Sequence, residues 1–573
     1  MSSYTLQEKK EHDASHLEHV SLNDGSKSSY DGADQGENKI NFSFFMTMVG
    51  LALAFIVAEV TPLFLVTCFT IIAADLDALD QVIWILVAPY IATGAIAPFV
   101  GNLSDVMGRR GIILLSLVLV VVAFILQAAA PNFACYLAGG VIAGAAIGIQ
   151  IMSVIAAASE LVPMHKRGAT IGYLAMAIIP FAPGSLYGQL IAEHSWRYIY
   201  LLLAIVSVLA FIVLFIFYRP PPRPLAAGMT KMEILKRIDY GGCVLSILGV
   251  VMFLIGINWG GGDYAWGSAR VISFLILGVL IMVVFVLYER YVVKYPMFPM
   301  RLIQSKRHFF AVSVLCLVSG VNYVPLTVFW TIQVYTVYEA SFQQAGVFLL
   351  PLGLCIVGGS IMSAIMISVF RRHVQWVLLL FCVSQTTGIG CMALFDKDNI
   401  NTVWAPMVIG LIGVGGVLLP SQVVFSVICP DDLIGTSVAL SVVVRMIGQV
   451  IGKSMFYNIF RSEVTALASN PDNLDIIAIP ALEAGFQNAE RIRVLVNQLT
   501  AGPLQFYVDR GLFPEITSSE AVATLVAGGK ELYSRAFPLL YLISIAWGAI
   551  ASISCVLLWG VDKYIDEHTA VHL

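Results

Sequence analysis

One carboxyl group stands inside an apolar stretch of the sequence, at Glu59 of a run that extends from about residue 44 to 67. A charged side chain at the centre of a bilayer costs roughly 2.5–3.5 kcal/mol on insertion scales, so such a group usually faces a cavity. Apolar surroundings favour the uncharged form of a carboxyl group, which is what a proton-coupling residue needs. Two interpretations stay open: Glu59 carries a coupling proton or binds substrate, or it is a glutamate at the outer membrane interface.

A second polar feature is a stripe of three residues in another apolar run, Arg445, Gln449 and Lys453. Residues spaced by four lie on one face of an α-helix, and basic groups that face lipid are expensive. The spacing predicts a stripe that faces a cavity, although a structural role in binding backbone carbonyls near the cytosolic end fits equally well.

Other amide and hydroxyl side chains in the apolar runs could supply hydrogen bonds to the same cavity. These candidates are Gln150, Asn322, Tyr323, Gln333, Gln385 and Gln422. Each one taken alone is more readily explained as a polar contact between helices.

The segment GNLSDVMGRRG, residues 101–111, follows the second apolar run. Gly101 and Gly108 permit close packing and a tight turn, and Asp105 can pair with Arg109 or Arg110 at the mouth of a helix. A charge cluster of this kind can hold one conformation closed and release it in another. Positive charge in a cytosolic loop would explain the arginines, but it would not explain the whole spacing, so we predict a gating motif.

The remaining chemistry-bearing residues predict neither an enzyme nor a cofactor site. The nine cysteines form no CxxC pair and have no metal-ligand or disulfide spacing. The sequence contains no nucleophile elbow, phosphate loop or metal constellation. It also lacks a basic arm or aromatic-interleaved basic patch, so nucleic acid is not an expected partner.

Composition indicates the elements that must position these residues. Apolar residues make up 59% of the chain and charged residues 12%, and the mean hydropathy is +0.86. Soluble domains carry about 25% charged and 45–50% apolar residues. Lipid must therefore be the solvent, and the backbone must satisfy its own hydrogen bonds as helices.

We expect an all-α polytopic membrane protein with fourteen transmembrane helices, because a helix needs roughly 20 apolar residues to cross a bilayer. The predicted spans are 44–67, 82–102, 112–131, 135–158, 169–192, 197–218, 240–258, 270–290, 309–336, 345–369, 375–395, 403–428, 433–460 and 535–560.

The distribution of Lys and Arg predicts the orientation of these spans. The short loops on one side carry sixteen basic residues and those on the other side carry three. The richer side is expected to be cytoplasmic, which places both termini in the cytoplasm. We expect a plasma-membrane protein, with the vacuolar or another internal membrane as the alternative.

The predicted organisation is six helices, then two, then six. Its parts are a disordered cytosolic tail (1–43), a six-helix bundle (44–218), a Pro-rich cytosolic linker (219–239), two extra helices (240–290), a second six-helix bundle (291–560) and a cytosolic tail (561–573). The linker predicts that the two extra helices are independent of both bundles.

Two outer features complete the prediction. The long connection 461–534 contains amphipathic stretches, which predict short helices on the outer face that could form a lid, while a solvated neutral loop fits equally well. The trio Glu193, Trp196 and Arg197 is expected to anchor the sixth span at the membrane interface, where Trp is enriched.

The loop at 101–111 resembles the signature loop of the major facilitator superfamily, G-x-L-x-D-x-x-G-R-[RK]. Further segments narrow this resemblance: ELVPMHKRGATIG (160–172), WRYIYLL (from residue 196), INWGGGDYAWGSA (257–269), LYERYVVKYPMFPMRL (287–302) and VRMIGQVIGKSMFYNIF (444–460). With fourteen spans and a long last outer loop, the chain from about residue 44 to 560 is similar to the fungal trichothecene efflux pump family.

The resemblance implies a major facilitator fold and a secondary transporter that works by alternating access of two six-helix halves. It implies export of amphipathic organic compounds, such as mycotoxins or xenobiotics, with protons as the coupling ion and no cofactor. Two antiporter motifs of the superfamily are degenerate, because residues 140–144 lack the expected Arg and Gln and residues 178–189 lack the expected Gly-Gly. Proton antiport therefore rests on the resemblance.

Two other functions stay open on the sequence. A related fourteen-span branch takes up siderophore–iron complexes, and the residues do not reveal the direction of transport. A non-transporting nutrient sensor is the other alternative, but such proteins need a long cytosolic signalling domain. The tails expected here have about 42 and 13 residues.

Overall fold

Apolar helices make up nearly the whole of the computed structural model, which describes residues 42–561 apart from internal stretches, the longest being 162–173, 221–238 and 496–512. Contacts between residues divide the chain into residues 1–45 and a compact unit of residues 46–573. Among the described residues, thirteen helices are long and apolar enough to cross a membrane. They coincide with thirteen of the predicted spans.

The first group of helices carries the signature loop. It comprises α2 (Phe42–Asp75), α3 (Val82–Ile96), α4 (Val100–Ala128), α5 (Phe133–Glu160), α7 (Gly184–Ala192) and α8 (Arg197–Phe217). α5 packs against α3 and α4, α8 packs against α4, and α2 lies against α7 and α8 through Gly188 and Gly50. Part of the predicted fifth span, 169–192, lies outside the described residues, and α7 is its described end, so a count of fourteen is compatible with the structure.

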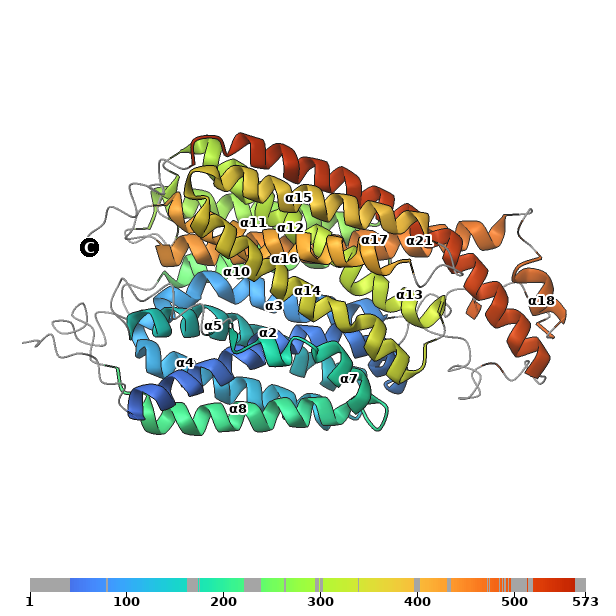
Figure 1. Cartoon of the computed structure of the whole chain (residues 1–573), viewed down its shortest axis with the longest axis horizontal. Coiled ribbons are helices and arrows are strands. Elements are labelled where there is room, and N and C mark those ends of the chain that lie inside the picture. The colour runs from blue at the N-terminus through green and yellow to red at the C-terminus, as the bar shows by residue number, and fades with distance from the viewer. Residues whose placement is uncertain are drawn as a thin grey trace, which may run out of the picture. The chain divides into compact units, whose positions relative to one another are not determined.

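The second group lies on the other side of the unit (Figure 1). It comprises α12 (Lys306–Val324), α13 (Trp330–Thr336), α14 (Phe342–Val369), α15 (Val374–Cys391), α16 (Trp404–Val427), α17 (Ile434–Ser469) and α21 (Ser519–Leu557). One π-helical turn, Pro325–Phe329, joins α12 to α13. The two groups meet where α3 packs on α17 and α7 packs on α14.

Two further helices, α10 (Tyr240–Trp259) and α11 (Ala269–Tyr291), pack mainly against each other. The predicted independence of this pair from both bundles is wrong for α10, which also packs on α3 and α17. Ser454 of α17 donates a hydrogen bond to Asn258 Oδ1 at 2.8 Å, and Asn458 Nδ2 donates to the carbonyl of Gly260 at 2.6 Å. A Pro-rich linker separates elements along the chain but does not prevent them from packing. The exact domain boundaries stay predictions.

Small residues and capping side chains explain the ends and the close spacing of these helices. Asn132 accepts a hydrogen bond from the backbone N–H of Cys135 and caps α5, and Ser341 and Gln344 form a capping box at α14. At Gly144 of α5, a Cβ atom would lie 2.1 Å from the carbonyl oxygen of Pro89 on α3. Only glycine permits this approach of the two backbones.

The segment 461–534 is partly described, and its described residues form helices joined by turns and irregular stretches. The flanking helices α17 and α21 extend into it, and the short helix α18 (Ala478–Glu483) packs on α21 (Figure 1). Ile477 and Ala481 are buried, and Arg535 Nη1 donates a hydrogen bond to Asn473 Oδ1 at 3.0 Å. This agrees with the prediction of a short packed helix. The structure does not test the role of a lid.

Candidate functional site

Three predicted cavity residues, Glu59, Tyr323 and Arg445, come together between the two groups of helices, and Tyr90, which the sequence did not single out, joins them. Glu59 of α2 and Tyr90 of α3 belong to the first group, and Tyr323 of α12 and Arg445 of α17 belong to the second. Arg445 interacts electrostatically with Glu59, Tyr90 and Tyr323. The packing of these four helices therefore places a carboxyl group, a guanidinium and two phenols close to one another.

Glu59 is the least constrained member of this cluster. Glu59 is half-buried, and its carboxyl group makes no hydrogen bond or ion pair with any residue that the structure describes. Pro62 lies one turn further along α2 and cannot donate a backbone hydrogen bond to the preceding turn. The carboxyl group thus lies opposite a positive charge without being bound to it, an arrangement in which it can exchange a proton or bind another group.

Arg445 is held by an amide of a neighbouring helix. With the amide of Gln422 oriented to present its oxygen, Oε1 accepts hydrogen bonds from Nη1 at 2.6 Å and from Nη2 at 3.0 Å. Arg445 is buried, and its Nε has no hydrogen-bond partner among the described residues. At Gly320 of α12, a Cβ atom would lie 2.3 Å from the carbonyl oxygen of Arg445, so the backbones of α12 and α17 are in close contact there.

Lys453 continues the stripe of α17 toward the first group. Its Nζ donates a hydrogen bond to the carbonyl oxygen of Leu86 at 3.1 Å and lies 3.2 Å from the centroid of the Tyr90 ring. Between these two basic residues, Gln449 is buried and its Oε1 has no partner among the described atoms. The three residues of the stripe therefore share one face of α17, and Lys453 binds a carbonyl of the opposite group of helices.

The other predicted amides divide into two kinds. Gln333 accepts a hydrogen bond from Tyr541 Oη at 2.6 Å, which makes it a contact between α13 and α21. Asn322 and Gln150 are buried, and no described atom hydrogen-bonds to either side-chain amide. Gln385 is buried with Nε2 unpaired among the described residues. Buried amides without partners are costly, so Asn322, which adjoins Tyr323, is available to a bound molecule.

Besides Tyr90, a second polar residue between the groups was missed by the sequence analysis. Gln189 of α7 accepts a hydrogen bond from Tyr335 of α13, and its Nε2 donates to the carbonyl of Thr67 at 2.6 Å. It is fully buried. The same rule that singled out the other amides, a polar side chain within an apolar run, would have found it.

Within the signature loop, the structure describes the side chains of residues 108–111 and not those of 101–107. Gly101 and Asp105 therefore lie outside the described residues, and the pairing of Asp105 with an arginine stays a prediction. Gly108 has φ +76°, a conformation that favours glycine, and the helix is broken there. Arg109 and Arg110 follow the break, half-buried.

Arg110 binds the end of α8. Its Nη2 donates to the carbonyl oxygen of Phe215 at 2.6 Å, and the guanidinium lies 5.6 Å from the centre of the Phe215 ring. This carbonyl belongs to the last turn of α8, whose final carbonyls have no intrahelical partners. Arg110 therefore links the signature loop to the last helix of the first group.

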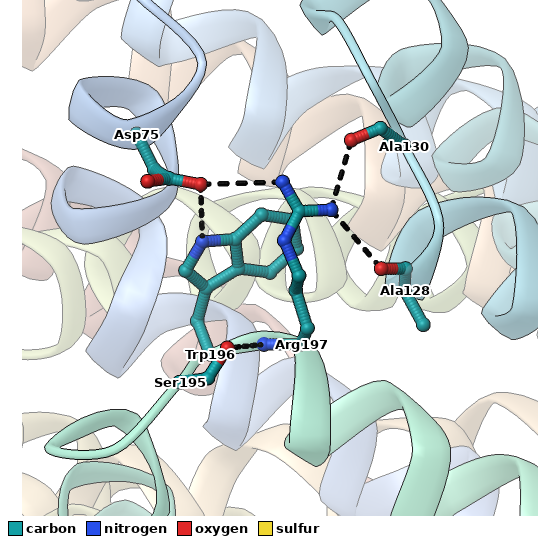
Figure 2. A network of polar contacts seen from close by, with 6 residues as sticks. All are labelled: Asp75, Ala128, Ala130, Ser195, Trp196 and Arg197. Atoms are coloured by element: carbon teal, nitrogen blue, oxygen red, sulfur yellow. Dashed lines mark hydrogen bonds and ion pairs between the residues drawn. The ribbon is translucent and has the colours of Figure 1, made fainter.

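At the other end of the first group, the predicted interfacial anchor is wrong for Trp196. Trp196 is only 4% exposed and packs edge-on against Tyr136 and Tyr200. Its Nε1 donates to Asp75 Oδ2 at 3.1 Å, and Arg197 Nη2 lies 3.3 Å from the same oxygen (Figure 2). The enrichment of Trp at interfaces ignores tertiary packing, which here buries the ring.

Arg197 completes this outer clamp, which we define as Asp75, Trp196 and Arg197. Its Nη1 donates to the carbonyl oxygens of Ala128 at 3.1 Å and Ala130 at 2.8 Å (Figure 2). The guanidinium lies 4.5 Å from the centre of the Trp196 ring. The clamp therefore joins the ends of α2 and α4 to the start of α8.

Within the described part of the chain, no group of three or more His, Cys, Asp or Glu residues could hold a metal ion. The polar groups described around Arg445 are instead the carboxyl group of Glu59, the basic groups of Arg445 and Lys453, phenols and amides. This set suits reversible binding of a proton and of a small molecule with hydrogen-bonding groups.

Comparisons with known proteins agree with this arrangement. The model of the fungal trichothecene efflux pump family (TRI12) matches residues 40–573. The MFS-type transporter gkaD of Penicillium citrinum is 28% identical over 399 residues, which cover 67% of this chain and 66% of that protein, slightly under two thirds of its length. The trichothecene efflux pump TRI12 of Fusarium sporotrichioides is 26% identical over 481 residues, covering 82% of this chain and 78% of that protein.

Among solved structures, a bacterial homolog of the human lysosomal transporter Spinster, in an inward-facing and unoccupied conformation, superposes with a TM-score of 0.56. The sequence identity is 16%, and the match covers 89% of this chain and 97% of that one. At this identity the likeness concerns the fold alone. It confirms the predicted all-α major facilitator fold.

Proposed function

Since the chain belongs to the fungal trichothecene efflux pump family, we propose that it exports amphipathic organic compounds, such as mycotoxins or xenobiotics, in exchange for protons. Relatives are named as a trichothecene efflux pump and as the efflux pumps FUS6 and aflT. Transport proceeds by alternating access, with the two groups of helices moving against each other around the site between them.

The observation that carries the proposal is the position of Glu59 opposite Arg445, one on each group of helices. Protonation of Glu59 removes the negative charge that attracts Arg445 across the junction. Arg445 then keeps its hydrogen bonds to the amide oxygen of Gln422, within its own group of helices. One proton therefore changes the attraction between the two groups, as coupling of transport to a proton gradient requires.

The substrate binds next to this pair. Arg445 Nε, Gln449 Oε1 and both amide atoms of Asn322 are buried without hydrogen-bond partners among the described residues. They offer donors and acceptors to a molecule whose remaining surface is apolar, which is the chemistry of an amphipathic organic compound.

The pump is proposed to lie in the plasma membrane with both termini in the cytoplasm. The support is the excess of Lys and Arg in the loops on one side of the predicted spans. The signature loop then faces the cytoplasm, and the outer clamp and α18 face the outside.

Substitution of Glu59 tests the coupling. A growth screen against toxic amphipathic compounds, with and without the full-length protein, first identifies a compound whose export protects the cell. Export of that compound is then measured in proteoliposomes with an imposed proton gradient for wild type, Glu59→Gln and the control Glu193→Gln, since Glu193 is an exposed acid outside the site.

We expect Glu59→Gln to bind the compound but to lose uphill export and its dependence on pH. One coupled proton contributes about 2.3 kcal/mol per 100 mV, so the steady-state gradient should fall by about 50-fold per 100 mV. Glu193→Gln should match wild type. Retained pH-dependent uphill export by Glu59→Gln would refute the role of Glu59. Accumulation of the compound on the cytoplasmic side of the wild-type protein would refute export.

A further inference from the structure

Lys453 is a fully buried basic residue at the junction of the two groups. No ion pair between described residues involves Lys453. Its polar contacts in the described part of the chain are with the carbonyl oxygen of Leu86 and the face of the Tyr90 ring, both on α3. Burial of an ammonium group without a carboxylate costs free energy. The contacts with Leu86 and Tyr90 offset part of this cost and so stabilise the conformation in which they form.

Tyr90 connects this contact to the proton site. Its ring is covered by the ammonium of Lys453 at 3.2 Å, and its phenol interacts electrostatically with Tyr323, Arg445 and Glu59. One side chain of α3 therefore contacts the lysine of α17 directly and interacts electrostatically with the carboxyl group of α2.

The backbones around Tyr90 and Lys453 are held in place by close packing. Pro89 lies against Gly144 of α5, where a Cβ atom would be 2.1 Å away from the carbonyl oxygen of Pro89. On the other side, Ser454 is bonded to Asn258 of α10 at 2.8 Å. Each of the two helices is thus packed against a further helix, α3 against α5 and α17 against α10, so a local rotation that relieved a lost Lys453–Tyr90 contact would disturb this packing.

We infer that Lys453 is a positioning residue for transport: through the Tyr90 ring it links the protonation of Glu59 to the contact between α3 and α17. The inference rests on the proposed proton coupling. In the conformation seen here, the lysine holds α3 against α17 and orients the phenol of Tyr90 near Glu59. Movement of the groups separates the lysine from the ring, which changes the surroundings of the carboxyl group.

The titratable and charged groups that face Glu59 are Arg445 from α17, Tyr90 from α3 and Tyr323 from α12. Lys453 reaches this set only through Tyr90. Replacing the lysine and replacing the phenolic hydroxyl should therefore have different effects, which separates a positioning role from a merely structural one.

The test measures the conformations directly and needs no substrate. Spin labels on a ketone-bearing amino acid are placed at the exposed residues Glu193 of the first group and Leu394 of the second, which leaves the native cysteines intact. Distances are recorded from acidic to neutral pH for the full-length protein in lipid nanodiscs. The variants are Lys453→Met, Lys453→Arg, Tyr90→Phe and, as a control for loss of a lysine, Lys306→Met at an exposed position.

In wild type, the ratio of two distance populations should change with pH. Lys453→Met should shift this ratio by about tenfold at every pH, because a desolvated cation–π contact is lost, and should remove most of the pH response. Lys453→Arg should restore both, since a guanidinium also stacks on the ring. Tyr90→Phe should keep the neutral-pH ratio of wild type but lose the pH response, and Lys306→Met should match wild type.

The outcomes distinguish the two proposals. A wild-type ratio that does not vary with pH would refute the proposed proton coupling itself. A pH response that survives in both Lys453→Met and Tyr90→Phe would refute only the role of Lys453. The contact of Lys453 with the Tyr90 ring does not link Glu59 to the α3–α17 contact if Tyr90→Phe changes the ratio as much as Lys453→Met. The same conclusion follows if Lys453→Arg elutes as a single folded species and still fails to restore the ratio.

Discussion

Removal of the guanidinium of Arg197 should destabilise the first group of helices through the outer clamp. Arg197→Met keeps the length of the side chain and eliminates three contacts: the bonds to Ala128 and Ala130 and the ion pair with Asp75. The carbonyl of Ala128 ends α4 and that of Ala130 lies just beyond its C-cap, where no intrahelical donor is available. Loss of the three contacts should therefore destabilise the junction of α2, α4 and α8.

The size of the effect follows from exposure. The side chains of Arg197 and Asp75 are 34% and 38% exposed, so solvent screening limits the ion pair to about 1 kcal/mol or less. Hydrogen bonds from a charged donor contribute about 1.5–3 kcal/mol each when buried, and partial exposure places both carbonyl bonds at or below the lower end of that range. We expect a total loss of about 2–4 kcal/mol, including the stacking on Trp196.

The assay is thermal unfolding of the purified protein in detergent at a fixed scan rate, because unfolding of large proteins is often irreversible. Arg270→Met is the control. In the described part of the chain, the Arg270 side chain donates a hydrogen bond to the Tyr264 hydroxyl at 2.8 Å and lies 5.0 Å from the Tyr264 ring centre. This contact is exposed to solvent, so its loss should lower the apparent Tm little. Equal Tm values for Arg197→Met and Arg270→Met would refute the reasoning that carbonyl capping stabilises this end.

Two glycines give further predictions. Gly144→Ala should reduce the yield of folded protein in size-exclusion chromatography, because its Cβ would overlap the carbonyl of Pro89. Gly358→Ala, with no described atom of another part of the chain within 4 Å of the new Cβ, should not reduce it. Equal yields would show that α3 and α5 can move apart. Gly108→Ala should destabilise the break in α4 by about 1–2 kcal/mol, because φ +76° strains an L-residue; an unchanged Tm would mean that this break relaxes without cost.

The sequence was sufficient for the spans and for the polar stripes within single helices. Thirteen spans agree with the structure because runs of apolar residues long enough to cross a bilayer occur for few other reasons. The spacing of Arg445, Gln449 and Lys453 placed them on one face of one helix for the same kind of local reason.

Contacts between helices could not be predicted in this way. Nothing in the local pattern around Glu59 shows that α17 lies opposite, since the two segments are separated by most of the chain. The same limit explains why Gln333 was grouped with the cavity residues, although Tyr541 binds it. It also explains why the interfacial position of Trp196 and the independence of α10 were predicted wrongly. Both predictions used general rules about membrane interfaces and linkers, which contain no information on packing between helices.

The π-helical turn at Pro325–Phe329 has a consequence for register. Such a turn contains one residue more than an α-helical turn, so it rotates everything after it by about 100° relative to an uninterrupted helix. Asn322 and Tyr323 precede the turn and lie at the site, while Gln333 and Tyr335 follow it and bond to α21 and α7. Deleting one residue of the turn would leave the composition of this span almost unchanged and yet turn its second half away from both partners. In this helix, chain length within a single turn matters more than the identity of any side chain in it.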